Sequence, residues 1–189
     1  GRALFKLNPS DVLETPFTAG DLARSAEVLL RSQPQAPAAA QSSRCWAITG
    51  AVGGAGATTL AIELAVGLAD RKSNERVALV DLNLADGQAC AYLGAAANMN
   101  LGEASLTPER IDAALLDAFA VRVDDCLDLY AAPRDPRAFE HVSAPAVLRL
   151  LEVCCEVYDW VVVDVPRLRQ PWTAEALGGS DEVLVVSEL

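Results

Sequence analysis

From residue 45 onwards, short runs of mostly apolar residues alternate with longer stretches of mixed polarity. The apolar runs predict strands at residues 45–49, 76–81, 126–131, 160–165 and 182–187. The stretches between them predict helices at residues 58–70, 107–120, 143–157 and 172–177. Strands that are apolar on both faces and alternate with helices are typical of a parallel sheet covered on both sides. We therefore expect an α/β fold, with a mostly parallel sheet and helices on both faces.

The first 43 residues follow a different pattern. Residues 22–31 predict a helix with four apolar positions on one face, and residues 32–43 are rich in Pro, Ala, Gln and Ser, as linkers are. We therefore expect a fragment at 1–31, a linker at 32–43 and the main domain at 44–189. Because the chain opens on Gly1 and stops at Leu189, directly after an apolar run, we expect truncation at both ends.

Charge is unevenly distributed along the chain. The 189 residues carry a net charge of −11, while residues 45–189 hold ten Lys/Arg and twenty-two Asp/Glu, which is 10 − 22 = −12. Affinity for nucleic acid and for anionic lipid comes from basic side chains, so we expect neither partner. No run of about eighteen apolar residues is present, and we expect no membrane segment. Solubility alone is a sufficient reason for the acidity.

Cysteine and histidine usage argues against a zinc site. The five cysteines include no C-x-x-C pair, and His141 is the only histidine. An odd number of cysteines with one adjacent pair is not typical of a disulfide framework, so we expect reduced thiols in the cytoplasm. We expect His141 to be a surface or capping residue just before a helix.

A glycine-rich stretch joins the first predicted strand to the first predicted helix. Residues 50–59 read G-A-V-G-G-A-G-A-T-T. Glycines in this context let backbone N–H groups converge on an anion, and the helix N-terminus adds its positive end. The candidate cofactor-binding residues are Gly53, Gly54, Ala55, Gly56, Ala57, Thr58 and Thr59. The alternative is a tight glycine-rich turn that binds no ligand.

Two aspartates end predicted strands, and we expect both at the edge of the sheet that holds this loop. Asp81 ends the run R-V-A-L-V-D, and Asp164 lies in V-V-V-D-V-P. Ligands of open α/β sheets bind at the carboxyl edge of the strands. Carboxylates and a threonine hydroxyl are suitable ligands for a hydrated Mg²⁺. We therefore take Thr58, Asp81 and Asp164 as candidate metal ligands, although a strand-end aspartate alone could also cap a helix.

These motifs resemble the MinD/ParA family of deviant Walker P-loop ATPases. That family carries K-G-G-x-G-K followed by two Ser/Thr residues where this chain has V-G-G-A-G-A-T-T at 52–59. The family's strand-end D-x-D is Asp81-Leu-Asn83 here, and its Walker B aspartate matches Asp164. Within the family the chain resembles the TadZ/CpaE branch, in L-x-D-G-x-A-x-x-x-L-G at 84–94, L-Y-A-A-P at 129–133 and Y-D-W-V-V-V-D-V-P-R at 158–167.

The resemblance implies ATP and Mg²⁺ as cofactors and a homodimer that pairs face to face. It also implies a cytoplasmic role at the cell pole, in the localisation and assembly of Flp (Tad) pilus machinery. Members of the branch carry a receiver-like domain upstream. Residues 11–31 are similar to the last strand and helix of a receiver, with Thr15 where a receiver has lysine, which implies a pseudo-receiver that is not phosphorylated.

The departures from the family pattern concern positive charge. The two loop lysines are Val52 and Ala57 here, and Asn83 replaces the second aspartate. The chain has only Lys6 and Lys72, and a helix of about twelve residues places Lys72 roughly 18 Å from the loop. We therefore expect weak or lost ATP binding and weak or absent hydrolysis, and we assign no catalytic residue.

Two alternatives remain open. The first is an active ATPase that uses an arginine, such as Arg167 or Arg169, or a residue of a partner. The second is the output module of a pseudo-response regulator with no connection to pili.

Overall fold

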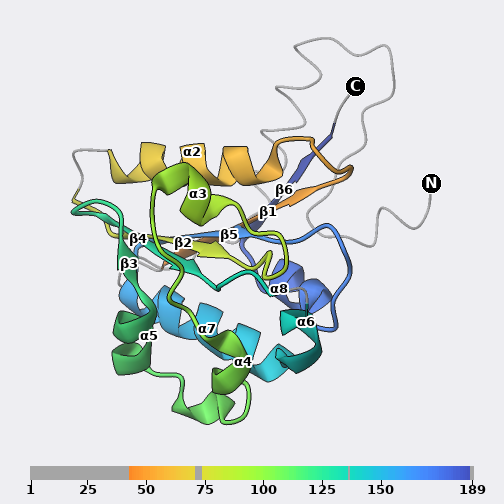
Figure 1. Ribbon diagram of the computed structural model, residues 1–189. Coiled ribbons are helices and arrows are strands. Elements are labelled where there is room, and N and C mark those ends of the chain that lie inside the picture. Colours follow the sequence, from red (N-terminus) through yellow and green to blue (C-terminus); the bar gives the residue numbers. More distant parts are fainter. Residues whose placement is uncertain (1–42, 71–73, 136, 188–189) are drawn as a thin grey trace, which may run out of the picture. The chain divides into compact units, whose positions relative to one another are not determined.

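The computed structural model describes residues 43–70, 74–135 and 137–187, which all belong to one compact unit. Its centre is a six-stranded sheet with the order β3-β4-β2-β5-β1-β6 (Figure 1). The strands are β1 Arg44–Gly50, β2 Val77–Asp81, β3 Val121–Arg122, β4 Leu127–Ala131, β5 Trp160–Asp164 and β6 Glu182–Val186. All neighbouring pairs are parallel except β3 with β4. The expected mostly parallel sheet is confirmed.

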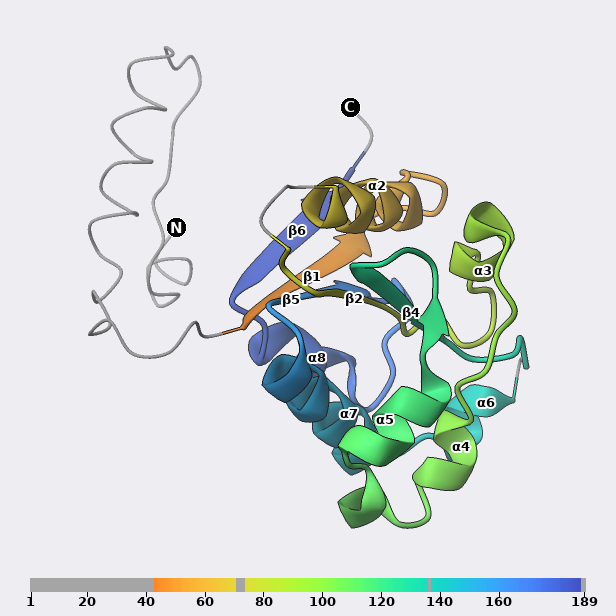
Figure 2. The ribbon, with the colours of Figure 1, turned by 90° about the vertical axis from the view of Figure 1, so that its left-hand side faces the viewer.

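Helices cover both faces of the sheet, as expected (Figures 1 and 2). One face carries α2 Ala57–Ala69 and the short α3 Ala89–Leu93, and the other carries α4 Leu101–Ala104, α5 Ala113–Phe119, α7 Ala144–Val157 and α8 Thr173–Gly178. Two further short elements are the 3-10 turn η2 Pro108–Arg110 and the helix α6 Ala138–His141. No described helix has both the length and the apolar character that crossing a membrane requires.

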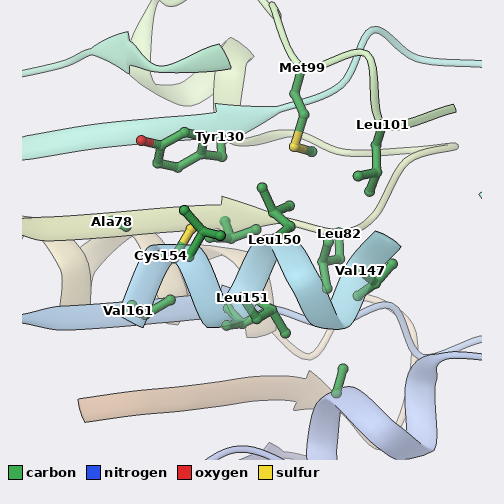
Figure 3. Close-up of a cluster of buried hydrophobic side chains, with 14 of the residues drawn as sticks. Ala78, Leu82, Met99, Leu101, Tyr130, Val147, Leu150, Leu151, Cys154 and Val161 are labelled. Atoms are coloured by element: carbon green, nitrogen blue, oxygen red, sulfur yellow. The ribbon is translucent and has the colours of Figure 1, made fainter. Parts of the chain in front are cut away.

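The sheet separates two hydrophobic cores, so its central strands are buried on both faces. Every residue of β2, β4 and β5 is buried, which explains why these segments are apolar except for Asp81, Asp128 and Asp164. Figure 3 shows the core beneath α7, where Val147, Leu150 and Cys154 pack towards the sheet. Burial of each such aliphatic side chain contributes about 1.5–3 kcal/mol. These strands therefore form a rigid base for the loops at their carboxyl ends.

Capping residues determine where α7 and α5 begin. The Ser143 hydroxyl accepts a hydrogen bond from the N–H of Ala146 at the start of α7, and Pro145 occupies its first turn. The helix predicted at 107–120 is wrong as a single element. It consists of η2 and then α5, because Asp112 caps a new helix by accepting bonds from the N–H groups of Ala114 and Leu115 at 3.0 and 2.9 Å.

The short elements α3, α4, α6 and β3 are absent from the sequence-based reading, because none is long enough to show a period. The fragment at 1–31 and the linker at 32–43 fall outside the described residues, apart from Ser43, and stay predictions. His141 ends α6, lies just before the N-cap Ser143 of α7 and is exposed, so its expected surface position before a helix is confirmed.

Candidate functional site

The glycine-rich loop joins the carboxyl end of β1 to the start of α2 (Figure 1). Gly54 and Gly56 adopt φ angles of 83° and 90°, a left-handed conformation that favours glycine. A Cβ atom at Gly53, Gly54 or Gly56 would meet nothing within 4 Å. The glycines therefore serve the backbone path, and the space above the loop is open.

The loop leaves backbone donors exposed at the start of α2. Gly56 is the N-cap of this 13-residue helix and provides no side-chain cap. In the described part of the chain, the N–H groups of Gly54, Gly56 and Ala57 donate no hydrogen bond. Uncapped N–H groups at a helix N-terminus form an anion-binding site together with the helix dipole. The loop therefore has the backbone geometry that phosphate binding requires.

Thr58 and Asp164 meet at this loop. The Thr58 hydroxyl donates a hydrogen bond to Asp164 Oδ2 at 2.7 Å, which joins the first turn of α2 to the end of β5. Asp164 is 3% exposed, so its carboxylate is held in place by the surrounding core. Two of the three candidate metal ligands are therefore in direct contact.

Asp81, the third candidate, lies beside Asp164 in the neighbouring strand. The two residues are paired in the register of β2 with β5. The carboxylate of Asp81 accepts hydrogen bonds from the N–H groups of Asn83 at 2.9 Å and Ala89 at 3.3 Å. A Cβ at Gly87 would lie 2.6 Å from Asp81 Oδ2, so the loop after β2 closes tightly around this side chain. Asp81 thus also organises the start of α3.

Burial raises the cost of ionising both carboxylates, and the charge of Asp164 adds to that cost for Asp81. Burial, followed by the charge of Asp164, raises the pKa of Asp81 to about 7 against the bonds from Asn83 and Ala89. Burial also raises the pKa of Asp164, while the bond from Thr58 lowers it. Such a pair gains from a cation, which stabilises the ionised form of both groups. The electrostatics therefore favour metal binding at this point.

The chemistry of the donor set fits a hydrated Mg²⁺ better than a softer metal. The available groups are a threonine hydroxyl and one or two carboxylates, and Mg²⁺ bound to phosphates uses such oxygens together with water. Among the described residues there is no group of three or more His, Cys, Asp and Glu side chains that could hold a metal ion alone. Thr58 and Asp164 would hold Mg²⁺, and Asp81 would support it from the adjacent strand.

The loop borders a hollow of about 280 Å³ that contains little positive charge. Its lining includes every candidate cofactor-binding residue from Gly53 to Thr59, together with Asn83, Gln88, Tyr92 and Asp164. Among the described residues that line it, Arg167 is the only one with a cationic side chain. Val52 lines the same hollow and is 44% exposed, so an apolar side chain occupies the mouth of the site.

Sequence reasoning missed one arginine near this site. Arg134, three residues after β4, donates hydrogen bonds to the carbonyl of Gly87 at 2.9 Å and to Gln88 Oε1 at 2.6 Å. Its charge also lowers the pKa of Asp81, although burial of the carboxyl dominates. A basic residue just after a strand that ends at the ligand edge is the signal that could have identified it.

A larger hollow of about 800 Å³ lies away from the loop. Its lining comes mainly from residues 97–103 and 132–142 and includes Leu106 and His141. Among the described residues, no glycine-rich loop borders it, and the helix that begins there is the four-residue α4, whose N-cap Asn100 accepts a hydrogen bond from the N–H of Glu103. Volume alone would favour this hollow, but the chemistry of phosphate and metal binding favours the smaller one.

Comparison with known proteins agrees with this geometry. The family model described as "AAA domain" matches residues 43–189. A ParA family ATPase from Chlorobium tepidum superimposes with a TM-score of 0.69 at 24% identity, over 77% of this chain and 60% of that chain. The septum site-determining protein MinD from Pyrococcus horikoshii, solved with Mg-ADP, has a TM-score of 0.62 at 19% identity, over 76% and 57%.

The fold is shared more widely than with these two proteins. The kinase domain of the Escherichia coli tyrosine kinase ETK has a TM-score of 0.61 at 21% identity, over 95% of this chain and 70% of that chain. No curated protein matches the chain. The chain spans about 60% of the length of the ParA and MinD structures. From the match over residues 43–189 and the P-loop geometry, the chain belongs to the AAA domain family and has the fold of ParA- and MinD-type P-loop ATPases.

Proposed function

We propose that this chain is a ParA/MinD-type protein that binds Mg·ATP weakly and hydrolyses it slowly or not at all. The single observation that carries the proposal is an open phosphate loop in a hollow where, among the described lining residues, Arg167 is the only cation. Ala57 and Val52 stand where the resembled family has lysines. The loop would hold phosphates through backbone N–H groups, and Thr58 and Asp164 would hold the magnesium.

The loss of two lysines determines how much weaker ATP binding is expected to be. Each charge-assisted hydrogen bond to a phosphate contributes on the order of 1.5–3 kcal/mol. Two such bonds together correspond to a loss of roughly a hundredfold or more in affinity. Transfer of a phosphoryl group depends on positive charge over the transferring oxygens, so turnover suffers more than binding. Asn83 also lacks the carboxylate that the resembled family has at this position.

We assign the protein a role in the polar localisation and assembly of Flp (Tad) pilus machinery. It would act as a homodimer in the cytoplasm at the cell pole. This assignment rests on the resemblance of residues 84–94, 129–133 and 158–167 to the TadZ/CpaE branch. The same resemblance makes residues 11–31 the end of a pseudo-receiver domain. A fluorescent fusion should gather at one pole, and deletion of the gene should remove Flp pili. A diffuse fusion together with normal pili would refute the role.

A second candidate function is supported by Arg167. Its presence in the lining of the loop hollow leaves room for a working ATPase in which this arginine replaces a lysine. The two functions differ in one measurement. Steady-state turnover of Mg·ATP by the chain and by its Asp164→Ala variant should be equal and near background for the weak binder. Turnover that Asp164→Ala abolishes would favour the ATPase.

Affinity is the direct test of the proposed function. Titration calorimetry of Mg·ATP into the chain should give a dissociation constant weakened into the high micromolar range or beyond, and EDTA should weaken it further. Asp117→Ala is a matched control, because Asp117 is an exposed carboxylate on α5, away from the hollow. Submicromolar binding would contradict the proposal, and so would the absence of any heat at millimolar nucleotide.

A further inference from the structure

The side chain of Gln88 contacts an arginine and also lines the hollow beside the phosphate loop. Its Oε1 accepts a hydrogen bond of 2.6 Å from Arg134, which is not among the described residues that line this hollow. A second bond, of 2.9 Å, runs from Arg134 Nε to the carbonyl of Gly87. The two bonds hold the guanidinium against the segment that carries Gln88, whose side chain is itself exposed.

The contact with Arg134 determines which end of the Gln88 carboxamide is available to a ligand. A guanidinium has only N–H donors and no acceptor, so the atom of Gln88 that meets it must be the oxygen. The NH2 group leaves the same carbon in another direction. Gln88 makes no side-chain cap bond at the start of α3, and in the described part of the chain its Nε2 donates no hydrogen bond. The NH2 donors of Gln88 are therefore available to a ligand in the hollow.

The backbone around Gln88 is held by a buried carboxylate. The N–H of Ala89 donates to Asp81 Oδ2 at 3.3 Å, and Gly87 lies so close to the same oxygen that a Cβ there would be 2.6 Å from it. The N–H of Tyr92 donates to the carbonyl of Gln88 at 3.1 Å. A binding group on such a segment needs little further ordering when it meets a ligand.

The positive charge of Arg134 strengthens Gln88 as a donor. An ionised donor polarises the carboxamide that it binds, and a polarised carboxamide donates more strongly from its NH2 group. The same charge acts at the carboxyl edge of the sheet, where it lowers the pKa of Asp81, although burial of that carboxyl raises the pKa more. Gln88 therefore offers a phosphate oxygen a stronger hydrogen bond than an isolated amide would.

We propose that Gln88 is a phosphate-binding residue of this site and that Arg134 is its positioning residue. The inference rests on the proposed function and deepens it, because it assigns a side-chain donor to a loop that has Val52 and Ala57 in place of the lysines of the resembled family. Gln88 would donate from Nε2 to a phosphate oxygen of Mg·ATP, while Arg134 holds Oε1. A neutral donor brings less charge than an ammonium group, so it supports binding without restoring turnover.

Nuclear magnetic resonance of the full 189-residue chain tests the contact itself. The side-chain NH2 signals of Gln88 are assigned by their loss in Gln88→Met. Titration with Mg·ATP should shift them together with the backbone N–H signals of Gly54 and Gly56. Magnesium tripolyphosphate should do the same, because the contact is with phosphate. The NH2 signals of Gln170, which lies outside the described lining of the hollow, are the control and should not move.

Dissociation constants from the Gly54 signal measure what the pair contributes. Gln88→Met removes the donor and keeps the length of the side chain, and we expect Mg·ATP affinity to fall about tenfold. The matched control Gln170→Met should bind as the parent does. Arg134→Lys keeps the charge but loses the fork that holds Gln88, so it should weaken binding in the parent and have no further effect in Gln88→Met. Circular dichroism melting shows whether each variant is folded.

The possible results separate this inference from the proposed function. Shifts at Gly54 and Gly56 without shifts at the Gln88 NH2 group overturn the inference and leave weak nucleotide binding intact, and so does a folded Gln88→Met variant with the affinity of the parent. A loss from Arg134→Lys that is equal in both backgrounds overturns the positioning role. If no loop signal moves at millimolar Mg·ATP, the inference and the proposed function fail together. Joint shifts with the tenfold loss support the inference.

Discussion

The Thr58 hydroxyl donates its hydrogen bond to Asp164, 106 positions along the chain, at 2.7 Å. This contact joins the phosphate loop to the centre of the sheet, because Asp164 ends β5 between β1 and β2. A hydroxyl and a carboxylate are thereby held together where a hydrated Mg²⁺ would need both. The fold itself positions the two groups, since the first turn of α2 and the end of β5 meet at this edge of the sheet.

Thr58→Val should separate the structural and the metal role of this contact. Removal of the hydroxyl leaves a buried carboxylate with one donor fewer, and we expect a loss of about 1–2 kcal/mol in the free energy of unfolding. Urea unfolding measures this loss. Thr107→Val is the control, because Thr107 is exposed and makes no side-chain cap bond at the start of η2. Calorimetry should also show that Mg²⁺ no longer improves ATP affinity. Equal stability of the two variants would contradict this account.

Gly87→Ala should destabilise the site more than any other glycine change in the described chain. Its Cβ would lie 2.6 Å from Asp81 Oδ2 and 2.7 Å from the carbonyl oxygen of Asn83. We expect a cost of about 1–3 kcal/mol from this overpacking. Gly67→Ala is the control within α2, where a Cβ meets nothing within 4 Å, and it should stabilise the chain by about 0.5–1 kcal/mol. Thermal unfolding of both variants shows whether Gly87→Ala lowers and Gly67→Ala raises the stability of the chain.

Cys155 should be the thiol with the most acidic pKa in the chain. A hydrogen bond from the Cys45 thiol lowers the pKa of Cys155 to about 7, although burial acts in the opposite direction. Only the thiolate reacts with iodoacetamide, so labelling of Cys155 should be slow below pH 6 and should level off above pH 8. Peptide mass spectrometry measures the profile.

The Cys45→Ala variant is the control for that profile. It removes the donor, and we expect the midpoint for Cys155 to move to higher pH. Cys154 is fully buried, and burial raises the pKa of its thiol well above the usual range, so it should stay unlabelled in the native chain. A midpoint that Cys45→Ala leaves unchanged would disprove the assigned cause.

Arg167→Ala tests how much of the residual nucleotide affinity comes from the one cation in the hollow. One charge-assisted bond is worth about 1.5–3 kcal/mol, so we expect ATP affinity to fall roughly ten- to a hundredfold. Arg169→Ala, two residues further and outside the lining, should have little effect. If both variants bind ATP as the parent does, backbone N–H groups and Mg²⁺ supply all of the affinity and Arg167 is a surface charge.

Much of the fold could be predicted because its main signals are local. The strands around Val162 and Leu79 are apolar at every position before their final aspartate, as a strand buried on both faces requires. Ser143 and Pro145 indicate the start of α7 within one residue. The break between η2 and α5 was missed, since Asp112 acts as a cap only when the chain before it already turns. Short elements such as α3 depend on tertiary contacts, here the bond from Ala89 to Asp81.

The candidate site was predicted in part. Loop glycines and strand-end aspartates are visible in sequence, because strand ends of a parallel sheet share one edge. The sequence could not show that both carboxylate oxygens of Asp81 accept hydrogen bonds from backbone N–H groups. Nor could it show that Arg134 donates a hydrogen bond to Gln88. Such contacts depend on loop paths that no periodicity encodes. For the same reason, the sequence does not reveal that Tyr92 is exposed.

The measurement that tests the central claim most directly is ATP binding by the double variant Val52→Lys with Ala57→Lys. The glycine geometry is already open, so two new ammonium groups should meet the phosphates of a competent loop. Calorimetry should show affinity rising by one to several orders of magnitude, on about 1.5–3 kcal/mol per charged bond, with an unchanged melting temperature. Unchanged affinity with a lowered melting temperature would show that the loop is a structural turn and that this site does not recognise nucleotide.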